Sequence, residues 1–149
     1  MRSIYLATAY SYKSDSRLFS IISKLSNYQP FKFIVGISLA LRSRKITKVC
    51  AKIMSDGNIV FSPITHSHYI AVLGNLPALS HTFWLEQDKF WVDACDEIWV
   101  FDGLPWETSY GVKREIEWGL EQKKPVRFVN KQGKPGLPIT SAIKIINQP

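Results

Sequence analysis

Blocks of hydrophobic residues alternate along the chain with amphipathic stretches, and each block has the length of a strand or a helix. Short apolar runs bounded by turn residues predict strands that a sheet buries on both faces. We expect four such strands, at 3–10, 58–64, 96–103 and 125–129. Apolar residues at helical intervals predict helices at 37–55, at 81–95 and in the segment that follows "SYG" at 109–111. The run between 65 and 77 is expected to be a polar loop.

Strands that alternate with helices are typical of an α/β domain with a mainly parallel sheet. Ligands in such domains bind outside the carboxyl ends of the strands. Three polar clusters follow three of the predicted strands, namely "TAYSY", "SPITHSH" and "DGLPWETSYG". We therefore expect residues that are distant in sequence to meet at one edge of the sheet and to form a binding site there.

The composition limits the class of protein. The chain has 149 residues, enough for one domain with a buried core, and 46% of them are hydrophobic. No apolar run reaches the ~20 residues that a membrane span needs, and the amino terminus lacks the features of a signal peptide. Cys50 and Cys95 lie in apolar segments without metal-site spacing. We expect a cytoplasmic protein with reduced core cysteines and no membrane association.

The net charge of +7 and the isoelectric point near 9.5 make an anionic partner plausible. The basic residues are scattered along the sequence, and the densest group is "RSRK" at 42–45. Because no zinc-finger spacing or RNA-binding aromatic signature accompanies them, we do not favour nucleic acid as the partner. A small phosphorylated substrate satisfies the same charge balance.

Glu115 poses the clearest chemical question. It lies early in the helix that follows Ser109, where the helix dipole stabilises an exposed carboxylate by ~0.3–1 kcal/mol. One interpretation is a solvated, helix-stabilising charge. The other is a catalytic carboxylate that the dipole keeps ionised, as a nucleophile requires. Ser109 is likewise either a helix N-cap or, together with the first N–H groups of the helix, part of an anion-binding site.

Other polar residues at the same edge are weaker candidates. Asp88 lies in the aromatic helix at 81–95, where an exposed acid is common. His66 and His68 lack a third ligand for a metal site, so we expect them to bond to a ligand or to cap the loop. Asp102 ends a strand, where aspartate usually stabilises a turn. Stacking on a base or sugar and packing in the core are both open for the aromatic residues Tyr10, Trp106 and Tyr110.

The order of short motifs resembles that of the nucleoside 2-deoxyribosyltransferases. The motifs are "YLA" in the first strand, D-x7-D at Asp88 and Asp96, S-x-G-V-x-x-E from Ser109 to Glu115, and "KPV". Among these proteins the chain is most similar to the 2'-deoxynucleoside 5'-phosphate N-hydrolases. It is closer still to the uncharacterised DUF1937 family, whose members carry segments of the "VFSPITHSH" and "FWLEQD" type. The resemblance covers the first strand and residues 37–129, so that 11–36 is expected to be an insertion and 130–149 a tail.

This resemblance implies a flavodoxin-like, three-layer fold with a sheet of about five strands, formed by a single domain over residues 1–149. It implies that Glu115 is the nucleophile that attacks the anomeric carbon. It also implies that Asp88 protonates or steadies the departing base. Ser109, with Gly111 in the same motif, is expected to contact a 5'-phosphate, which favours a nucleoside monophosphate over a nucleoside.

The same resemblance extends to the rest of the site and to assembly. Further substrate contacts are expected from Ala7, Tyr10, His66, His68 and Asp102. We expect no cofactor and no metal. We also expect a homo-oligomer, because in this superfamily a neighbouring subunit often completes the site.

Two positions depart from the superfamily pattern. Glu117 replaces the glycine of the usual E-x-G, and "ATAY" at 7–10 replaces a glycine-rich loop. Both changes affect how closely the backbone approaches the sugar and phosphate. Several functions therefore stay open: hydrolysis of an N-glycosidic bond, transfer of a deoxyribosyl group between bases, nucleotide binding without turnover, and nucleic-acid binding through the basic residues.

Overall fold

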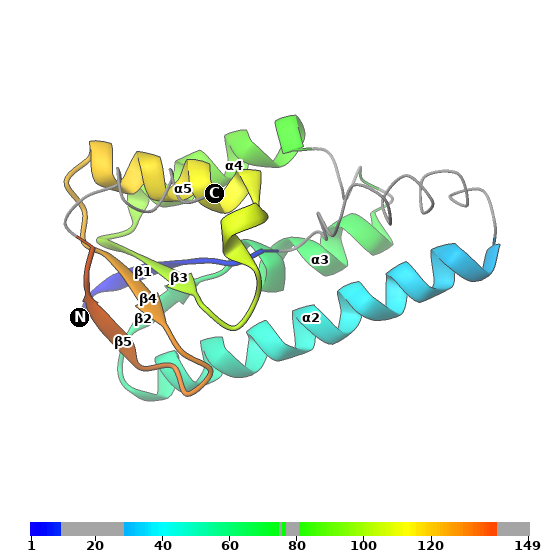
Figure 1. Cartoon of the computed structure of the whole chain (residues 1–149), viewed down its shortest axis with the longest axis horizontal. Helices are drawn as coiled ribbons and strands as arrows, with labels where there is room; N and C mark the ends of the chain where they lie inside the picture. The colour runs from blue at the N-terminus through cyan, green and yellow to red at the C-terminus, as the bar shows by residue number, and fades with distance from the viewer. Residues whose placement is uncertain (10–28, 75, 77–80, 140–149) are drawn as a thin grey trace.

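The structure, a computed structural model, describes residues 1–9, 29–74, 76 and 81–139. Its strands are β1 (Ser3–Ala7), β2 (Ile59–Phe61), β3 (Glu97–Phe101), β4 (Val126–Val129) and β5 (Pro135–Pro138). Its helices are α2 (Gln29–Ser55), α3 (Pro63–Leu73), α4 (His81–Ala94) and α5 (Tyr110–Glu121), with a short 3₁₀ helix, η1 (Trp106–Thr108), before α5. The long helix α2 runs alongside the sheet, and its amino-terminal turns extend beyond it (Figure 1).

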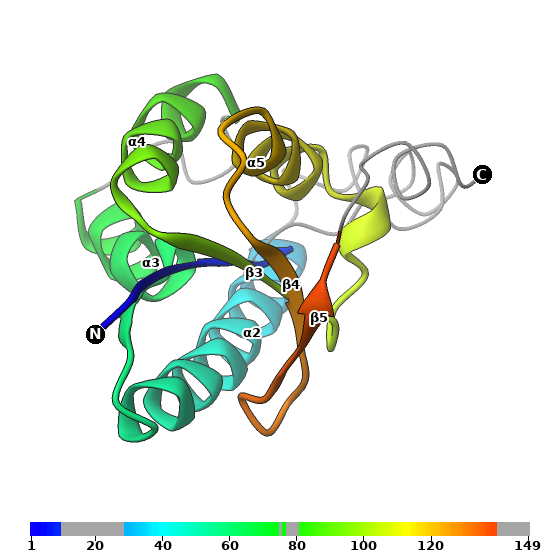
Figure 2. The same ribbon diagram turned by 90° about the vertical axis from the view of Figure 1, so that its left-hand side faces the viewer.

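The five strands form one sheet in the order β2-β1-β3-β4-β5. The first four strands are parallel, and only β5 is antiparallel to its neighbour β4. This order is that of flavodoxin-like folds. Helices α4 and α5 cover one face of the sheet and α2 covers the other (Figure 2). The prediction of a three-layer α/β fold with a mainly parallel sheet is confirmed.

Alternate residues of the central strands supply the two cores of the domain. Tyr5 and Ala7 of β1 pack toward α4 and α5, whereas Ile4 and Leu6 pack toward α2. Both sets are fully buried. This period of two is what a strand covered on both faces requires. It also decides which side chains of β1 can reach a site on the α4–α5 side.

The region after the first helix differs from the prediction. A strand was expected over 58–64 and a polar loop over 65–77, but β2 ends at Phe61 and helix α3 begins at Pro63. Ser62 caps this helix by accepting a hydrogen bond from the Thr65 backbone N–H, and proline suits the first helical position. The strand is also not buried on both faces, because β2 is an edge strand and Ile59 is 54% exposed.

Parts of the predicted insertion and of the predicted tail form a helix and a strand of the fold. Helix α2 begins at Gln29 instead of near residue 37, so the last part of the expected insertion is helical. The rest of the expected insertion, residues 11–28, lies outside the described residues. In the tail, β5 adds the antiparallel edge strand, and 140–149 lies outside the described residues.

Two further expectations concern the cysteines and the membrane. Cys50 and Cys95 are free and buried, as predicted. They lie on opposite faces of the sheet. Within the described part of the chain, no helix combines the length and the apolar character needed to cross a bilayer.

Candidate active site

Glu115 is buried under helix α5, on the face that packs against the sheet. It lies three residues after Val112 and four before Gly119, and residues at these intervals share one face of a helix. Gly119 allows a close approach, because a Cβ atom there would lie 2.7 Å from Cγ1 of Ile98. The Glu115 side chain is only 5% exposed. The interpretation of Glu115 as a solvated charge is therefore wrong.

The two oxygens of Glu115 differ in their hydrogen bonds to the described residues. The Tyr5 hydroxyl donates to Oε1 of Glu115 at 2.9 Å, across from the middle of β1. Oε2 is buried and has no hydrogen-bond partner in this part of the chain. A buried polar atom left in this state costs ~1–3 kcal/mol or more when it carries charge. A fold that retains this cost inside the domain has a candidate for chemistry there.

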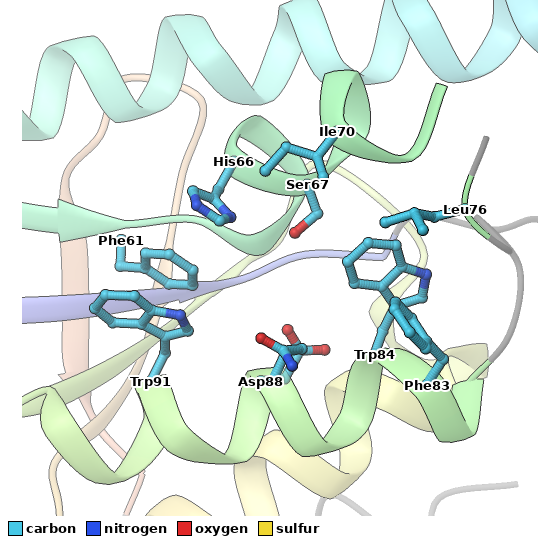
Figure 3. Close-up of a pocket in the computed structure, with 10 residues that line it drawn as sticks. Phe61, His66, Ser67, Ile70, Leu76, Phe83, Trp84, Asp88 and Trp91 are labelled. Carbon is cyan, nitrogen blue, oxygen red and sulfur yellow. The ribbon is translucent and has the colours of Figure 1, made fainter. Parts of the chain in front are cut away.

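Asp88 lies on α4, beside this buried pair, and faces a pocket (Figure 3). Its side chain is partly buried, and burial raises its pKa to about 7, although hydrogen bonding to Tyr5 opposes the shift. Tyr5 thus interacts with both carboxyl groups. The pKa of the Tyr5 hydroxyl is itself held well above its usual value by burial and by the charges of Glu115 and Asp88. Tyr5 therefore stays protonated and acts as the donor.

The two carboxyl groups titrate as a pair near neutral pH. The pKa of Glu115 is raised to about 8, first by burial and then by the negative charge of Asp88, while the hydrogen bond from Tyr5 opposes the shift. The expectation that the helix dipole keeps Glu115 ionised is wrong, because Glu115 lies beyond the first turn of α5 and loses its hydration. At neutral pH the pair holds about one proton between its two members.

The pocket beside Asp88 lies between α3 and α4 and has a volume of about 200 Å³. Its lining is mostly apolar and aromatic, with a few polar groups: Phe61, His66, Ser67, Ile70, Leu76, Phe83, Trp84, Gln87, Asp88 and Trp91. Figure 3 shows His66, Ser67 and Ile70 of α3 facing Asp88 and Trp91 of α4. The rings of Phe61 and Trp91 are stacked, with centroids 4.1 Å apart. Small-molecule sites commonly have this combination of apolar walls and a few polar groups.

The start of helix α5 is separate from this pocket. Ser109 is the N-cap of α5, and its hydroxyl accepts a hydrogen bond from the Val112 N–H at 3.4 Å. A Cβ atom on Gly111 would meet nothing within 4 Å. Neither residue lines the pocket. Ser109 therefore caps the helix, and a phosphate contact at Ser109 and Gly111 stays a prediction.

The other candidate residues lie in three kinds of place, namely the pocket, the interior of the domain and an exposed turn. His66 lines the pocket, and its ring lies 5.4 Å from that of Phe61. His68 is buried on the same helix, and both histidines are in a helix instead of the expected loop. Ala7 is fully buried in β1, and Asp102 is exposed in the turn after β3. Tyr10 lies outside the described residues.

The remaining aromatic and acidic positions of the motifs do not line the pocket. Trp106 packs against the core, with its ring 4.8 Å from that of Phe128, and Tyr110 is 51% exposed. Asp96 accepts hydrogen bonds from the backbone N–H and the hydroxyl of Ser3, at 2.7 and 2.8 Å. These bonds lie where β1 and β3 begin, which is the edge of the sheet away from the candidate site.

Tyr5 is the residue of the candidate site that the sequence analysis missed. The available signal was a residue with a polar tip inside an apolar strand, at a position whose neighbours in the strand alternate between the two cores. Ser67 and Gln87 in the pocket were missed as well, because their helix, or their face of it, was not recognised. In the described part of the chain no three His, Cys, Asp or Glu side chains come together as a metal site would require.

Comparison with known proteins supports one part of the resemblance. The profile of the family described as "Domain of unknown function (DUF1937)" matches residues 2–131. The matched region contains the described strands β1 to β4, all four described helices and the carboxyl pair. The comparison with curated proteins found no match. By its sequence and over most of its length, the chain belongs to the DUF1937 family.

Proposed function

We propose that this protein cleaves the N-glycosidic bond of a 2'-deoxynucleoside 5'-monophosphate and releases the base. One observation carries the proposal: the buried Glu115, which accepts a hydrogen bond from the Tyr5 hydroxyl, and the partly buried Asp88 form a carboxyl pair with raised pKa values beside an aromatic pocket. The motif order that resembles the nucleoside 2-deoxyribosyltransferases supports the same reaction. Retaining glycosidases also use two carboxyl groups, one as nucleophile and one as acid.

In this reaction Glu115 attacks the anomeric carbon as the bond to the base breaks. The transition state resembles an oxocarbenium ion, which a carboxylate stabilises and then traps as a covalent ester. A 2'-deoxy sugar suits this route because no electron-withdrawing 2'-hydroxyl opposes the developing positive charge. Water, which gives a proton to the Asp88 carboxylate, then attacks the anomeric carbon, so that 2-deoxyribose 5-phosphate leaves and the Glu115 carboxylate is regenerated. Oε2, which has no hydrogen-bond partner among the described residues, is the oxygen assigned to the first attack.

The proton that the pair holds at neutral pH goes to the departing base. Asp88 faces the pocket, so it is the member of the pair that meets the base. Positive charge that develops on the sugar favours the ionised form of Glu115, and the proton is then held by Asp88. Tyr5, which bonds to Glu115 and lowers the pKa of both acids, stabilises whichever of them is ionised.

The pocket suits the base and does not suit the phosphate. Among the residues that the structure describes, its lining contains rings that can stack on a planar group and contains no lysine or arginine. A 5'-phosphate is therefore assigned to the amino terminus of α5, where Ser109 and the first N–H groups lie.

A panel of nucleosides and nucleoside monophosphates, with free base measured by chromatography, tests this proposal. Deoxynucleoside monophosphates should release base faster than ribonucleotides and deoxynucleosides. Asp88→Asn should slow the release most for bases that leave poorly, because acid assistance matters most for them. No base release from any substrate by the parent protein would reject the proposal. Adding a second base and measuring the exchanged nucleoside distinguishes transfer from hydrolysis.

A second candidate function is nucleotide binding without turnover. It is favoured by the burial of Glu115, which is 5% exposed and does not line the pocket. Calorimetric titration with the same panel separates the two functions. Heat of binding without free base, unchanged in Glu115→Gln, identifies a binding protein.

A further inference from the structure

We propose that the exposed face of helix α2 binds the phosphate backbone of nucleic acid. The α2 basic face consists of Arg44, Lys48 and Lys52, extended by Lys131 from the β4–β5 turn. All four side chains are exposed. The proposal goes beyond the reaction at the carboxyl pair and does not depend on it. It also revises the expectation from the sequence, in which these cations are dispersed.

The charge on α2 has one sign. The helix contains six lysine and arginine residues and no aspartate or glutamate: Lys32, Arg42, Arg44, Lys45, Lys48 and Lys52. Three of them, Arg44, Lys48 and Lys52, are spaced by four residues, which places them on one face at intervals of about 6 Å along the axis. The opposite face carries Ile46 and Ile53, which are fully buried against the sheet.

The β4–β5 turn packs against the carboxyl-terminal end of this row. The Lys52 ammonium donates to the Lys131 carbonyl at 3.1 Å. A Cβ atom on Gly133 would lie 3.1 Å from Cβ of Lys52, so the turn and the helix are in close contact. Gly133 has a φ of +77°, which favours glycine at this position. The exposed Lys131 therefore adds a cation where α2 ends.

The charges of the α2 basic face are not compensated within the described part of the chain. Asp56, which directly follows α2 in the sequence, is bonded to Lys134 at 2.7 Å. Lys45, at the side of the row, is directed to the Gly103 carbonyl at 2.7 Å, next to the exposed Asp102. No ion pair joins a residue of the α2 basic face to a carboxylate among the residues that the structure describes.

On the α4–α5 side of the molecule, by contrast, cations form ion pairs with nearby carboxylates. On α4, Lys89 forms an ion pair with Asp93, and on α5, Arg114 pairs with Glu117 at 2.6 Å. An uncompensated row of cations attracts a polyanion and releases its counterions. A membrane is a poorer partner, because binding to a bilayer surface needs an apolar helix face, and that face of α2 packs on the sheet.

Fluorescence anisotropy with a labelled duplex of about 20 base pairs tests the proposal across a salt series. Three to four phosphate contacts predict a slope of log K against log salt of about −3, since each contact contributes about −0.9. Arg44→Gln/Lys48→Gln/Lys52→Gln should weaken binding at least ~10-fold in low salt and flatten the slope. The matched control, Lys89→Gln/Lys113→Gln/Lys123→Gln, removes the same charge from the α4–α5 side and should bind as the parent does.

Three results would overturn the proposal. They are no binding of the duplex in low salt, equal weakening by the two triple variants, and tighter binding to vesicles of anionic lipid than to the duplex. The α2 variant should keep the base-releasing activity of the parent. A failure of this proposal is therefore distinguishable from a failure of the proposed reaction.

Discussion

The charged side chains on the two sides of the sheet differ in their burial and in their ion pairs. On the α4–α5 side, Asp88 and Glu115 lie inside the domain, and ion pairs such as Arg114–Glu117 lie outside. On the α2 side the buried carboxylate of Glu97, which accepts a hydrogen bond from Trp99, is neutralised by ion pairs with Arg2 and Arg127. The outside of α2 carries Arg44, Lys48 and Lys52, which form no ion pair with the residues that the structure describes. Buried charge lowers stability, whereas exposed charge has little effect on it. The comparison teaches that the interior of the α4–α5 side is where the fold retains groups for chemistry.

The largest effect that this difference predicts is a bell-shaped pH dependence of base release. The reaction needs one protonated and one ionised carboxyl, and the pair titrates with pKa values of about 7 and about 8. Activity should be highest between pH 7 and 8. Because both acids are protonated well below this range and both are ionised well above it, activity should fall ~100-fold two pH units outside either limb. A rate that is constant from pH 5 to pH 10 would contradict the shared proton.

Removal of the Tyr5 hydroxyl should have the next largest effect. Tyr5→Phe removes the donor to Glu115, so the pKa of Glu115 should rise further and less of the nucleophile should be ionised. Base release at neutral pH should fall ~10-fold to 100-fold, with the pH optimum shifted upward. Tyr69→Phe is the control, since Tyr69 is 65% exposed on α3. An unchanged pH profile for Tyr5→Phe would show that the hydroxyl only packs.

The close approach of α5 to the sheet predicts a stability effect. Gly119→Ala places a Cβ atom 2.7 Å from Ile98 and 3.2 Å from Val126, which should cost ~1–3 kcal/mol in the free energy of unfolding. Gly111→Ala is the matched control, because it lies on the same helix and its Cβ meets nothing within 4 Å. Denaturant unfolding measures both. Equal stabilities for the two variants would mean that α5 does not depend on Gly119 for its position.

The smallest predicted effect concerns the start of α5. Ser109→Ala removes the N-cap and should lower the free energy of unfolding by ~1 kcal/mol. If Ser109 also holds a 5'-phosphate, the variant should lose activity on deoxynucleotides and keep it on deoxynucleosides. Kinetics with both substrates decide the point. Equal losses on the two substrates would leave Ser109 as a helix cap alone.

The sequence was sufficient for the existence of β1 to β4 and of three of the four described helices, but it did not predict β5. Their apolar runs are long or clearly periodic, as in β3 and α4, so local pattern and tertiary structure agree. It was not sufficient for α3, because His66, Ser67 and His68 give that helix a polar first half. The capping signal in "SP" at 62–63 marked its start and was read as the end of a strand.

The candidate site was predictable in part. Glu115 and Asp88 were singled out from the motif order, and the structure brings them to one cluster. The role of Tyr5 and the raised pKa values were not predictable, since both depend on burial that only the packing of α5 on β1 creates. Ser109 and Gly111, from the same motif, do not line the pocket. They lie at the start of α5, whereas Glu115 lies further along the helix on its buried face.

Single-turnover base release by Glu115→Gln, measured together with its melting temperature, tests the central claim most directly. The amide keeps the size of the side chain and cannot attack, so base release should fall by several orders of magnitude. Because the pKa of Glu115 is raised from 4.5 to about 8, ionisation destabilises the folded parent as pH rises through this range. The variant should therefore melt close to the parent at pH 5 and above it at pH 8. Release at the parent rate, with a normal melting temperature, would contradict the account.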